Sequence, residues 1–386
     1  MDSSRDSQTE EASTAPLSDA AVLTVEQPGR AEGGKLKFAR ADGFHARLRE
    51  RVDSYFQDTG LSPRDCPALY RKVAVVLTWL TVSYILLVFG ADAWWQAIPL
   101  AVAVGLGIAA VGFNLQHDGG HRACSDHGWI NKLMALTMDL MGASSYIWHW
   151  KHGVIHHTYV NITGHDSDID LGALARLTPH QRRLPWHQFQ HWYLWPLYGF
   201  VLVKWQLYDD FRDMVSGHIG NTRFPRPRGW DLVTFIGGKV CFLMLALGIP
   251  LMLHPVWAVL LTFALVQCVA GVVLSVVFQL AHCVEEADFP LPEVATGRME
   301  NNFALHQVET TVDFAPRSRV ASWLLGGLNF QIEHHLFPQI CHIHYPALAP
   351  LVAETCKEYG VRYVVHDTIR AGVRSHYRWL RQMGRL

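Results

Sequence analysis

Charge is scarce in this sequence, and what there is nearly cancels. Only 17% of the 386 residues are charged, and the formal net charge at pH 7 is −1. An excess of basic residues would indicate binding to nucleic acid, and this balance gives no such indication. We therefore expect no nucleic acid among the partners.

Cysteine is scarce as well. The seven cysteines are odd in number, form no CxxC pair, and include two, Cys241 and Cys268, that lie in apolar runs. This pattern disfavours a disulfide framework and a zinc site made of cysteines. Residues 1–35 contain no aromatic residue and no apolar stretch that would begin a secretory signal, so we expect a disordered N-terminal tail there.

Two long stretches lack charge almost completely. Residues 73–116 contain one charged residue, Asp92, and residues 240–281 contain none. Each stretch is long enough for two membrane-spanning helices of roughly 20 residues, which predicts four spans in two hairpins at about 73–91, 95–115, 233–253 and 256–280. Lys239, near the start of the third span, is expected to extend along its helix so that the ammonium group reaches the interface.

Basic residues next to the hairpins predict the orientation. Arg71, Lys72 and Arg122 flank the first hairpin, three arginines between 223 and 228 precede the second, and neither hairpin tip contains Lys or Arg. By the positive-inside rule, both termini and the long middle segment of this multi-pass membrane protein are cytosolic. Residues 186–211 are crowded with aromatic side chains but interrupted by charged ones, which favours helices lying in the interface over a fifth span.

A shorter amphipathic pattern precedes the first span. Apolar residues recur at helical spacing over residues 44–56, which predicts a helix. That helix either lies on the membrane surface, covers the active site, or packs its apolar face in the ordinary way.

Histidine, in contrast, is abundant, and most of the notable histidines occur in three short groups. The groups are HDGGH with His117 and His121, WHWKHGVIHHTYVN with His149, His152, His156 and His157, and QIEHH with Gln331, His334 and His335. The four-residue spacing within the first two groups places paired imidazoles on one face of a helix, while His157 points about 100° away from His156. All three groups fall on the predicted cytosolic side.

Such a number of clustered imidazoles exceeds the four ligands of one zinc ion. Imidazole also suits iron, copper and nickel, so the ligand type leaves the metal open. The ligand count and a dry position beside the bilayer favour a pair of redox metals, and we predict a two-iron centre that uses O2 against an unactivated C–H bond. Nearby carboxylates either hold the second ring nitrogen of a ligand or are solvated loop residues: Asp118, Asp166, Asp168, Asp170 and Glu333.

Taken together, HDGGH, the HxxxHH pattern within KHGVIHHTYVN, and QIEHHLFP resemble the boxes of the membrane fatty-acid desaturases. The glutamine that opens the third box resembles front-end acyl desaturases and their bacterial linoleoyl-CoA-desaturase-like relatives. The similarity implies a desaturase domain over 36–365 and a C-terminal cytosolic helix over 366–386. The implied fold is all-α, with four transmembrane helices in two hairpins and a cytosolic helical cap that holds a His-rich diiron site.

The resemblance also implies a set of metal ligands. These are His117, His121, His152, His156, His157, His306, His334 and His335, with Asn302 holding a water ligand. Gln331 stands where other branches have histidine and would bind iron directly or through water. His282, at the end of the fourth span, either faces the centre or is an interface histidine. Five others are expected to form hydrogen bonds or to pack: His127, His149, His165, His342 and His344.

The implied reaction is O2-dependent insertion of a double bond into an acyl chain carried on CoA or on a lipid. The sequence has no HPGG haem motif of a fused cytochrome b5, so electrons are expected from a separate ferredoxin or cytochrome b5. Hydroxylation or another lipid oxidation on the same centre is the alternative within this class. A His-rich metal transporter or sensor would place its ligands at the span centres, and a scaffold with incidental histidines would leave three spaced boxes unexplained.

Overall fold

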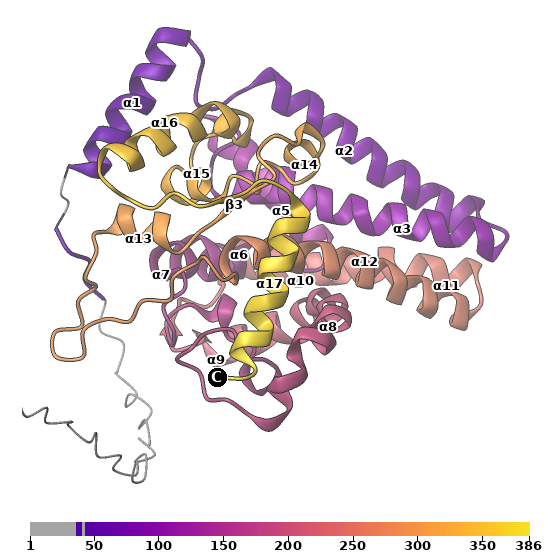
Figure 1. Ribbon diagram of the computed structural model, residues 1–386. Coiled ribbons are helices and arrows are strands. Elements are labelled where there is room, and N and C mark those ends of the chain that lie inside the picture. The colour runs from indigo at the N-terminus through magenta and orange to yellow at the C-terminus, as the bar shows by residue number, and fades with distance from the viewer. Residues whose placement is uncertain (1–35, 41–42) are drawn as a thin grey trace, which may run out of the picture. The chain divides into compact units, whose positions relative to one another are not determined.

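The computed structural model describes residues 36–40 and 43–386 (Figure 1). The predicted disordered tail, residues 1–35, therefore lies outside the described residues. Residues Lys35–Leu386 form one compact unit, which is mostly helical.

Four helical segments are long and apolar enough to cross a membrane: Pro67–Gly90, Trp94–Gly120, Trp230–Leu253 and Val256–His282. The first span consists of α2 (Pro67–Ile85) and the π-helical η1 (Leu86–Gly90), and the second of α3 (Trp94–Val111), the π-helical η2 (Gly112–Gln116) and α4 (His117–Gly120). The third consists of α10 (Trp230–Leu243), the π-helical η8 (Met244–Gly248) and α11 (Ile249–Leu253), and the fourth is the single helix α12 (Val256–His282). The four predicted spans are confirmed. The first begins earlier than predicted because Pro67 fixes the φ angle that starts a helix.

The two hairpins meet at the tips that lie far from the histidine groups. His254 Nε2 donates to the carbonyl oxygen of Val88 at 2.7 Å, which links one tip to the other. Trp94 and Trp95 are 74% and 62% exposed at the same end. Exposed tryptophans at this position are typical of a membrane interface.

Lys239 lies in the third span, and the prediction that it reaches the interface is wrong. Its side chain is buried, and its ammonium group donates to Asp210 Oδ2 at 2.6 Å and to the carbonyl oxygens of Gly142 and Gln206 at 2.6 and 2.7 Å. Burial raises the pKa of Asp210 to about 6, and the charge of Lys239 opposes that rise. The lysine therefore ties the third span to the middle segment.

The middle segment contains η6 (Pro185–Phe189), α8 (Gln190–Lys204), the π-helical η7 (Trp205–Asp209) and α9 (Asp210–Ser216). Within the described part of the chain, none of these is a candidate span, which agrees with the prediction. α8 packs closely on α12, since a Cβ on Gly271 would lie 2.8 Å from the carbonyl oxygen of Gly199. The aromatic side chains of Trp192 and Phe200 on α8 are exposed.

The remaining elements form the cap at the histidine end of the spans. They are α1 (Phe44–Thr59), α5 (Gly128–Leu140), α6 (Ser145–Trp148), the π-helical η3 (His149–His156), α7 (His157–Tyr159), the 3-10 turns η4 (Ser167–Ile169), η5 (Gly172–Leu174) and η9 (His342–His344), β1 (His218–Ile219), β2 (Thr222–Arg223), α13 (Phe303–Glu309), β3 (Asp313–Phe314), α14 (Arg319–Leu324), α15 (Gln331–Leu336), α16 (Tyr345–Glu358), β4 (Val365–His366) and α17 (Ile369–Met383).

The apolar face of α1 is buried against the cap. Phe44 and Leu48 pack with Ile332 and Leu336 of α15 and with Val352 of α16. α1 is thus an ordinary amphipathic helix whose apolar face is already covered by protein, and it also lies beside α13.

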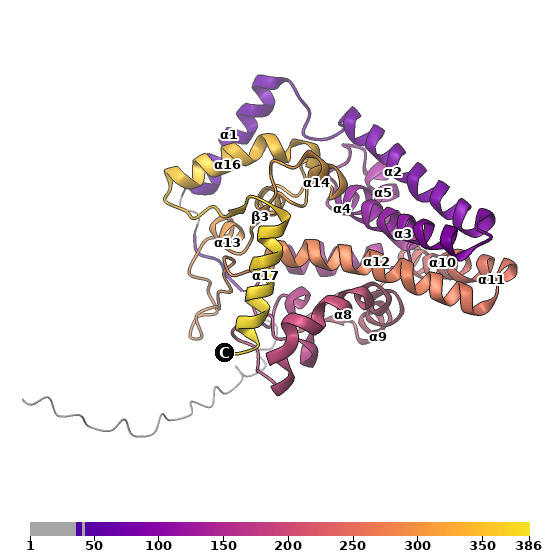
Figure 2. The ribbon, with the colours of Figure 1, turned by 45° about the vertical axis from the view of Figure 1, so that its right-hand side comes forward.

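Two short strands connect the cap to the end of the chain. β3 pairs in parallel with β4, with Asp313 opposite Val365 and Phe314 opposite His366. β4 leads directly into α17, the helix predicted within 366–386. Figures 1 and 2 both show α17 crossing α12 near the histidine end of that span.

The buried pair of Lys239 and Asp210 can be tested by substitution. Lys239→Met leaves the Asp210 carboxylate buried without its counter-charge, and we expect the free energy of unfolding to fall by about 3–5 kcal/mol. Unfolding in detergent, followed by circular dichroism, measures the change. The double variant Lys239→Met/Asp210→Asn should recover much of the loss, and a single variant as stable as the parent would contradict the assignment.

Candidate metal centre

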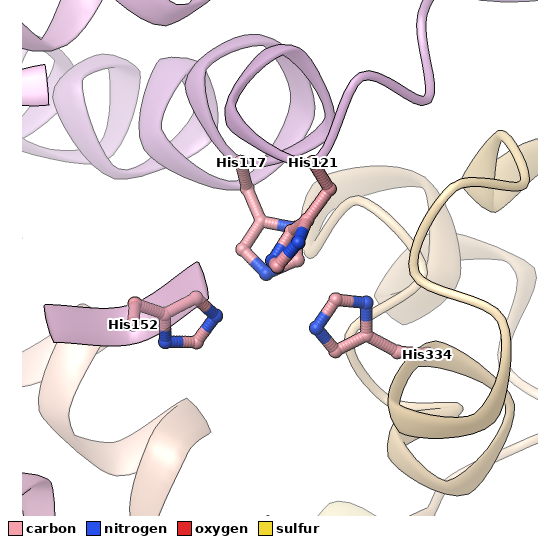
Figure 3. Close-up of side chains that lie close together, drawn as sticks. All are labelled: His117, His121, His152 and His334. Carbon is pink, nitrogen blue, oxygen red and sulfur yellow. The ribbon is translucent and has the colours of Figure 1, made fainter. Parts of the chain in front are cut away.

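The first histidine cluster joins four rings from three distant parts of the chain. His117 and His121 come from the end of the second span, His152 from η3, and His334 from α15. One nitrogen of each ring lies within 4.8 Å of the others, and all four residues are buried. Figure 3 shows His152 and His334 approaching from opposite sides the space that His117 and His121 face.

The second cluster lies directly beside the first. His156 of η3, His282 at the end of α12, and His335 of α15 also have ring nitrogens within 4.8 Å of one another. His157 lies between the clusters, with its Nε2 atom 2.9 Å from His334 Nε2 and its ring 4.4 Å from that of His335. The same two elements, η3 and α15, therefore supply residues to both clusters.

The direction of His157 differs from the prediction because η3 is a π-helical turn and not an α-helix. The ring centroid of His157 is 4.9 Å from that of His152, and that of His156 is 5.1 Å away, so both neighbours lie equally close. In a π-helix the hydrogen bonds run from i to i+5, so residues four and five apart share a side of the helix. On the opposite side of η3, Ile155 packs with Ile219 and Phe235.

The glycines of HDGGH allow the first box to fit against its neighbours. A Cβ atom on Gly120 would lie 2.1 Å from the ring of Trp148, and one on Gly119 would lie 2.6 Å from Met134. Trp148 in turn stacks on His152, with ring centroids 4.6 Å apart. Gly120 therefore lets the first box approach the second closely, and Gly119 lets it approach α5.

Several ring nitrogens in the clusters are buried without a hydrogen-bond partner among the described residues. They are His117 Nδ1, His121 Nε2, His152 Nε2, His156 Nε2, His157 Nδ1, His282 Nδ1 and His335 Nε2. Buried polar atoms are normally satisfied, so a group of this size needs an explanation. A cation bound between the rings would satisfy these nitrogens, and the donor set fits a metal that imidazole binds well.

Burial also keeps these rings neutral. It lowers the pKa of His121, His157 and His335 well below the ordinary value, and it lowers the pKa of His152 to about 3. Neutral imidazole has the free lone pair that a metal requires. For His156, burial acts in the same direction, but the Asp166 carboxylate outweighs it and raises the pKa.

The second nitrogen of several rings is held by a neighbour. His156 Nδ1 donates to Asp166 Oδ2 at 2.9 Å, and His335 Nδ1 donates to Gln307 Oε1 at 2.8 Å. His152 Nδ1 lies 3.9 Å from Asp168 Oδ2. Hydrogen bonds of this kind fix the orientation of a ligating imidazole, and Asp166 provides one, whereas Asp168 lies near His152 and pairs with Lys151 at 3.1 Å.

The other three predicted carboxylates serve elsewhere. Asp118 Oδ2 accepts a hydrogen bond from His342 Nδ1 at 2.7 Å, and His342 Nε2 lies 2.8 Å from Lys72 Nζ. Glu333 Oε1 accepts a hydrogen bond from the hydroxyl of Tyr363, and Asp170 caps a turn by accepting from the amide of Gly172. None of the three contacts a cluster nitrogen at hydrogen-bonding distance in the described chain.

His306 and Asn302 are not brought into either cluster. His306 Nε2 donates to the carbonyl oxygen of Val160 at 2.9 Å, and Asn302 caps α13 by accepting from the amide of Leu305. The short helix α13 instead turns the next residue, Gln307, toward His335. The sequence HQVETTVDF marks this segment, but it does not reveal which of the two adjacent residues faces inward.

His282 and Gln331 are brought to the centre. His282 belongs to the second cluster, and Gln331 Nε2 lies 3.1 Å from His282 Nε2. Of the histidines expected to bond or pack, His342 bonds to Asp118, and His344 Nε2 lies 3.1 Å from the sulfur of Cys66.

A cavity of about 610 Å³ opens beside the clusters and is lined in part by His117, His152 and Gln331. Its inner wall is apolar and includes Ile108, Phe113, Met138, Leu274 and Phe278. Its mouth includes Lys151, Lys204 and Arg212, whose charges are paired with Asp168, Asp209 and Asp213 at 3.1, 2.6 and 2.7 Å. The cavity suits a ligand with an apolar part beside the histidines and a polar part at the mouth.

Comparison with known proteins agrees with this geometry. The family model described as "Fatty acid desaturase" matches residues 92–367. The sn-1 linoleoyl-lipid 6-desaturase of Arthrospira platensis is 39% identical over 351 residues, which is 90% of this chain and 95% of that protein. The protein of the same name from Synechocystis sp. is 35% identical, with 91% and 98% covered. The acyl-lipid (8-3)-desaturase of Physcomitrium patens is 34% identical, with 90% and 74% covered.

The contact between Gln307 and His335 gives a test of how the rings are held. Gln307→Leu removes the oxygen that receives the His335 Nδ1 proton, and we expect metal affinity to fall by roughly 10–100-fold, the usual effect of losing such a partner. Equilibrium titration with a metal-binding competitor measures this affinity. Gln307→Glu retains an acceptor and should lose less, and equal affinity in the leucine variant would contradict the assignment.

Proposed function

The chain belongs to the fatty acid desaturase family, and on that premise we propose that its two histidine clusters hold two iron ions for O2-dependent desaturation of an acyl chain in the adjacent cavity. The protein is an oxidoreductase of fatty acyl chains, and its four apolar helices place it in a membrane. The observation that carries the proposal is the set of buried, unpartnered imidazoles beside a largely apolar cavity. Bound iron would supply the reduction of O2 and the oxidation of two adjacent C–H bonds.

We assign the ligands from the two clusters. His117, His121, His152 and His334 would hold one ion, and His156, His282 and His335 the other, with His157 between them. Eight imidazoles are too many for one zinc ion, and imidazole suits iron. His306 and Asn302 are left out because they lie in neither cluster, and His306 Nε2 and Asn302 Oδ1 bond to the backbone. Gln331 remains a neighbour of His282 that can act directly or through water.

The protein's own contribution is placement. Trp148 stacked on His152, together with Phe113, Leu274 and Phe278 along the cavity, would hold a chain beside the metal ligands and exclude water. Holding the reacting atoms in position accounts for a large share of the rate of such reactions. A displaced chain would react slowly or at another bond.

A lipid-linked acyl chain is the carrier we favour over acyl-CoA. The three relatives described above are named as acting on acyl-lipids. The mouth of the cavity also pairs each cation with a carboxylate, which suits a head group without the several phosphates of CoA. The two relatives named 6-desaturase support a front-end position for the new double bond.

Electrons would come from a separate ferredoxin or cytochrome b5. O2 takes four electrons to become two molecules of water, and the two C–H bonds supply only two of them. The clusters lie at the end of the spans where the basic flanking residues Arg71, Lys72 and Arg122 gather, which supports a cytosolic centre and cytosolic termini.

Expression in a host with simple lipids tests the function. We expect a new double bond in the host acyl chains, mapped by mass spectrometry, and no new product with His156→Ala. A product that has gained oxygen without losing hydrogen would instead indicate hydroxylation. The same product from the His156→Ala variant would remove the second cluster from the reaction.

Metal analysis tests the ligand assignment. The purified parent should contain about two iron ions per chain, and His156→Ala should lose at least one of them. His306→Ala is the matched control, because this histidine is buried next to the clusters but bonded to Val160, and it should keep both ions. Loss of iron from the His306→Ala variant would instead show that His306 is a metal ligand.

A further inference from the structure

The exposed face of α17 carries a row of arginines. Arg370, Arg374, Arg378 and Arg381 of α17 and Arg385 just after its end are all exposed, and the spacing of three and four residues places the four helical arginines along one side of the helix. In Figures 1 and 2, α17 is the yellow helix that crosses α12 near its histidine end. We call these five residues the arginine face.

The charges on this face have few partners within the protein. Arg378 lies 3.8 Å from Glu285, and across residues 36–40 and 43–386 the other four guanidinium groups have no ion pair and no side-chain hydrogen bond. At the mouth of the cavity, in contrast, every cation is paired with a carboxylate. Like charges four residues apart destabilise a helix, so a negatively charged partner explains this row better than the stability of α17 itself.

The apolar side of α17 is already covered by protein. Trp379, Leu380 and Met383 pack with Leu194 and Tyr198 of α8, on the side of the helix opposite the arginines. A helix that binds a bilayer inserts its apolar face into the lipid, and α17 has no such face to offer. Insertion of α17 into a bilayer is thereby excluded, and we take an acidic protein as the partner of the arginine face, with attraction to anionic head groups as the alternative that the test below separates.

The buried side of α17 also leads to the second histidine cluster. His376 Nδ1 donates to the carbonyl oxygen of Cys283 at 2.7 Å, and Cys283 directly follows His282 in the chain. Only the thickness of one helix, about 10 Å, separates His376 from a protein bound to the arginine face. Electron transfer slows steeply with distance, so this position suits a donor of electrons.

We propose that the arginine face of α17 docks the acidic surface of a one-electron carrier protein and that electrons enter the metal centre there. The inference rests on the proposed function. In each turnover two reduced carriers would give one electron each, the acyl chain would give two electrons and two protons, and two further protons would come from water. Together these convert one O2 to two waters and leave two oxidised carriers and one new double bond.

The test uses the full chain, loaded with iron and reconstituted into vesicles of zwitterionic lipid that contain the substrate. Reduced plant-type [2Fe–2S] ferredoxin and reduced cytochrome b5 are titrated separately. For the carrier that supports turnover, the triple variant Arg370→Glu/Arg374→Glu/Arg381→Glu should raise KM at least tenfold and abolish most of its dependence on salt, since exposed charges act through screened attraction. A second readout, one turnover of enzyme reduced beforehand with dithionite and then given O2, should be unchanged.

The matched control reverses three exposed arginines elsewhere, Arg49→Glu/Arg317→Glu/Arg319→Glu, and should leave KM near the parent value. An unchanged KM in the α17 variant overturns the inference, as does an equal rise in the control. A KM that is unchanged in zwitterionic vesicles and altered only when the vesicles contain anionic lipid would assign the face to lipid and also overturn the inference. If the triple glutamate variant also loses the dithionite-driven turnover, its fold is disturbed, and Arg370→Gln/Arg374→Gln/Arg381→Gln is used in its place. That variant must raise KM and keep the dithionite-driven turnover, and otherwise the inference is overturned. A parent that makes no product even after dithionite reduction refutes the proposed function instead.

Discussion

The structure depends on gathering neutral imidazoles in a place where water cannot satisfy them. Protonated rings at these separations would repel one another, and burial prevents protonation, as the depressed pKa values of His121, His157 and His335 show. The unpartnered nitrogens then carry a cost that no protein hydrogen bond offsets. A metal cation offsets it, so assembly of this end of the molecule and loading with metal are coupled.

π-helical turns occur at two of the three histidine boxes and help to bring the rings together. η2 lies immediately before His117, and η3 contains His152 and His156. A π-helical turn holds an additional residue, which rotates everything after it relative to an α-helix. In η3 this rotation brings His156 and His157 equally close to His152. One short segment thereby supplies rings to both clusters.

The spans and the boxes could be predicted from the sequence because each depends on local information. A run without charge predicts a span whatever its neighbours are, and His117 with His121 lies on one face of any helix. Contacts between distant segments could not be predicted. The partner of Lys239 is Asp210, which lies in a separate helix, so an isolated span suggested that the lysine would reach for the interface. His306 and Gln307 differ by one position on a seven-residue helix, and only the packing of α13 decides which of them turns inward.

One helix, α12, contacts the cavity, the second histidine cluster and α17. Its middle contacts α8 through Gly271 and borders the cavity through Leu274 and Phe278. Its last residue, His282, joins the second cluster, and the next residue, Cys283, bonds to α17. The paired charges at the cavity mouth and the unpaired charges on α17 thus lie at different surfaces served by one helix. If a carrier protein binds α17 as proposed, an acyl chain can remain in the cavity while electrons arrive, because neither partner has to leave for the other to bind.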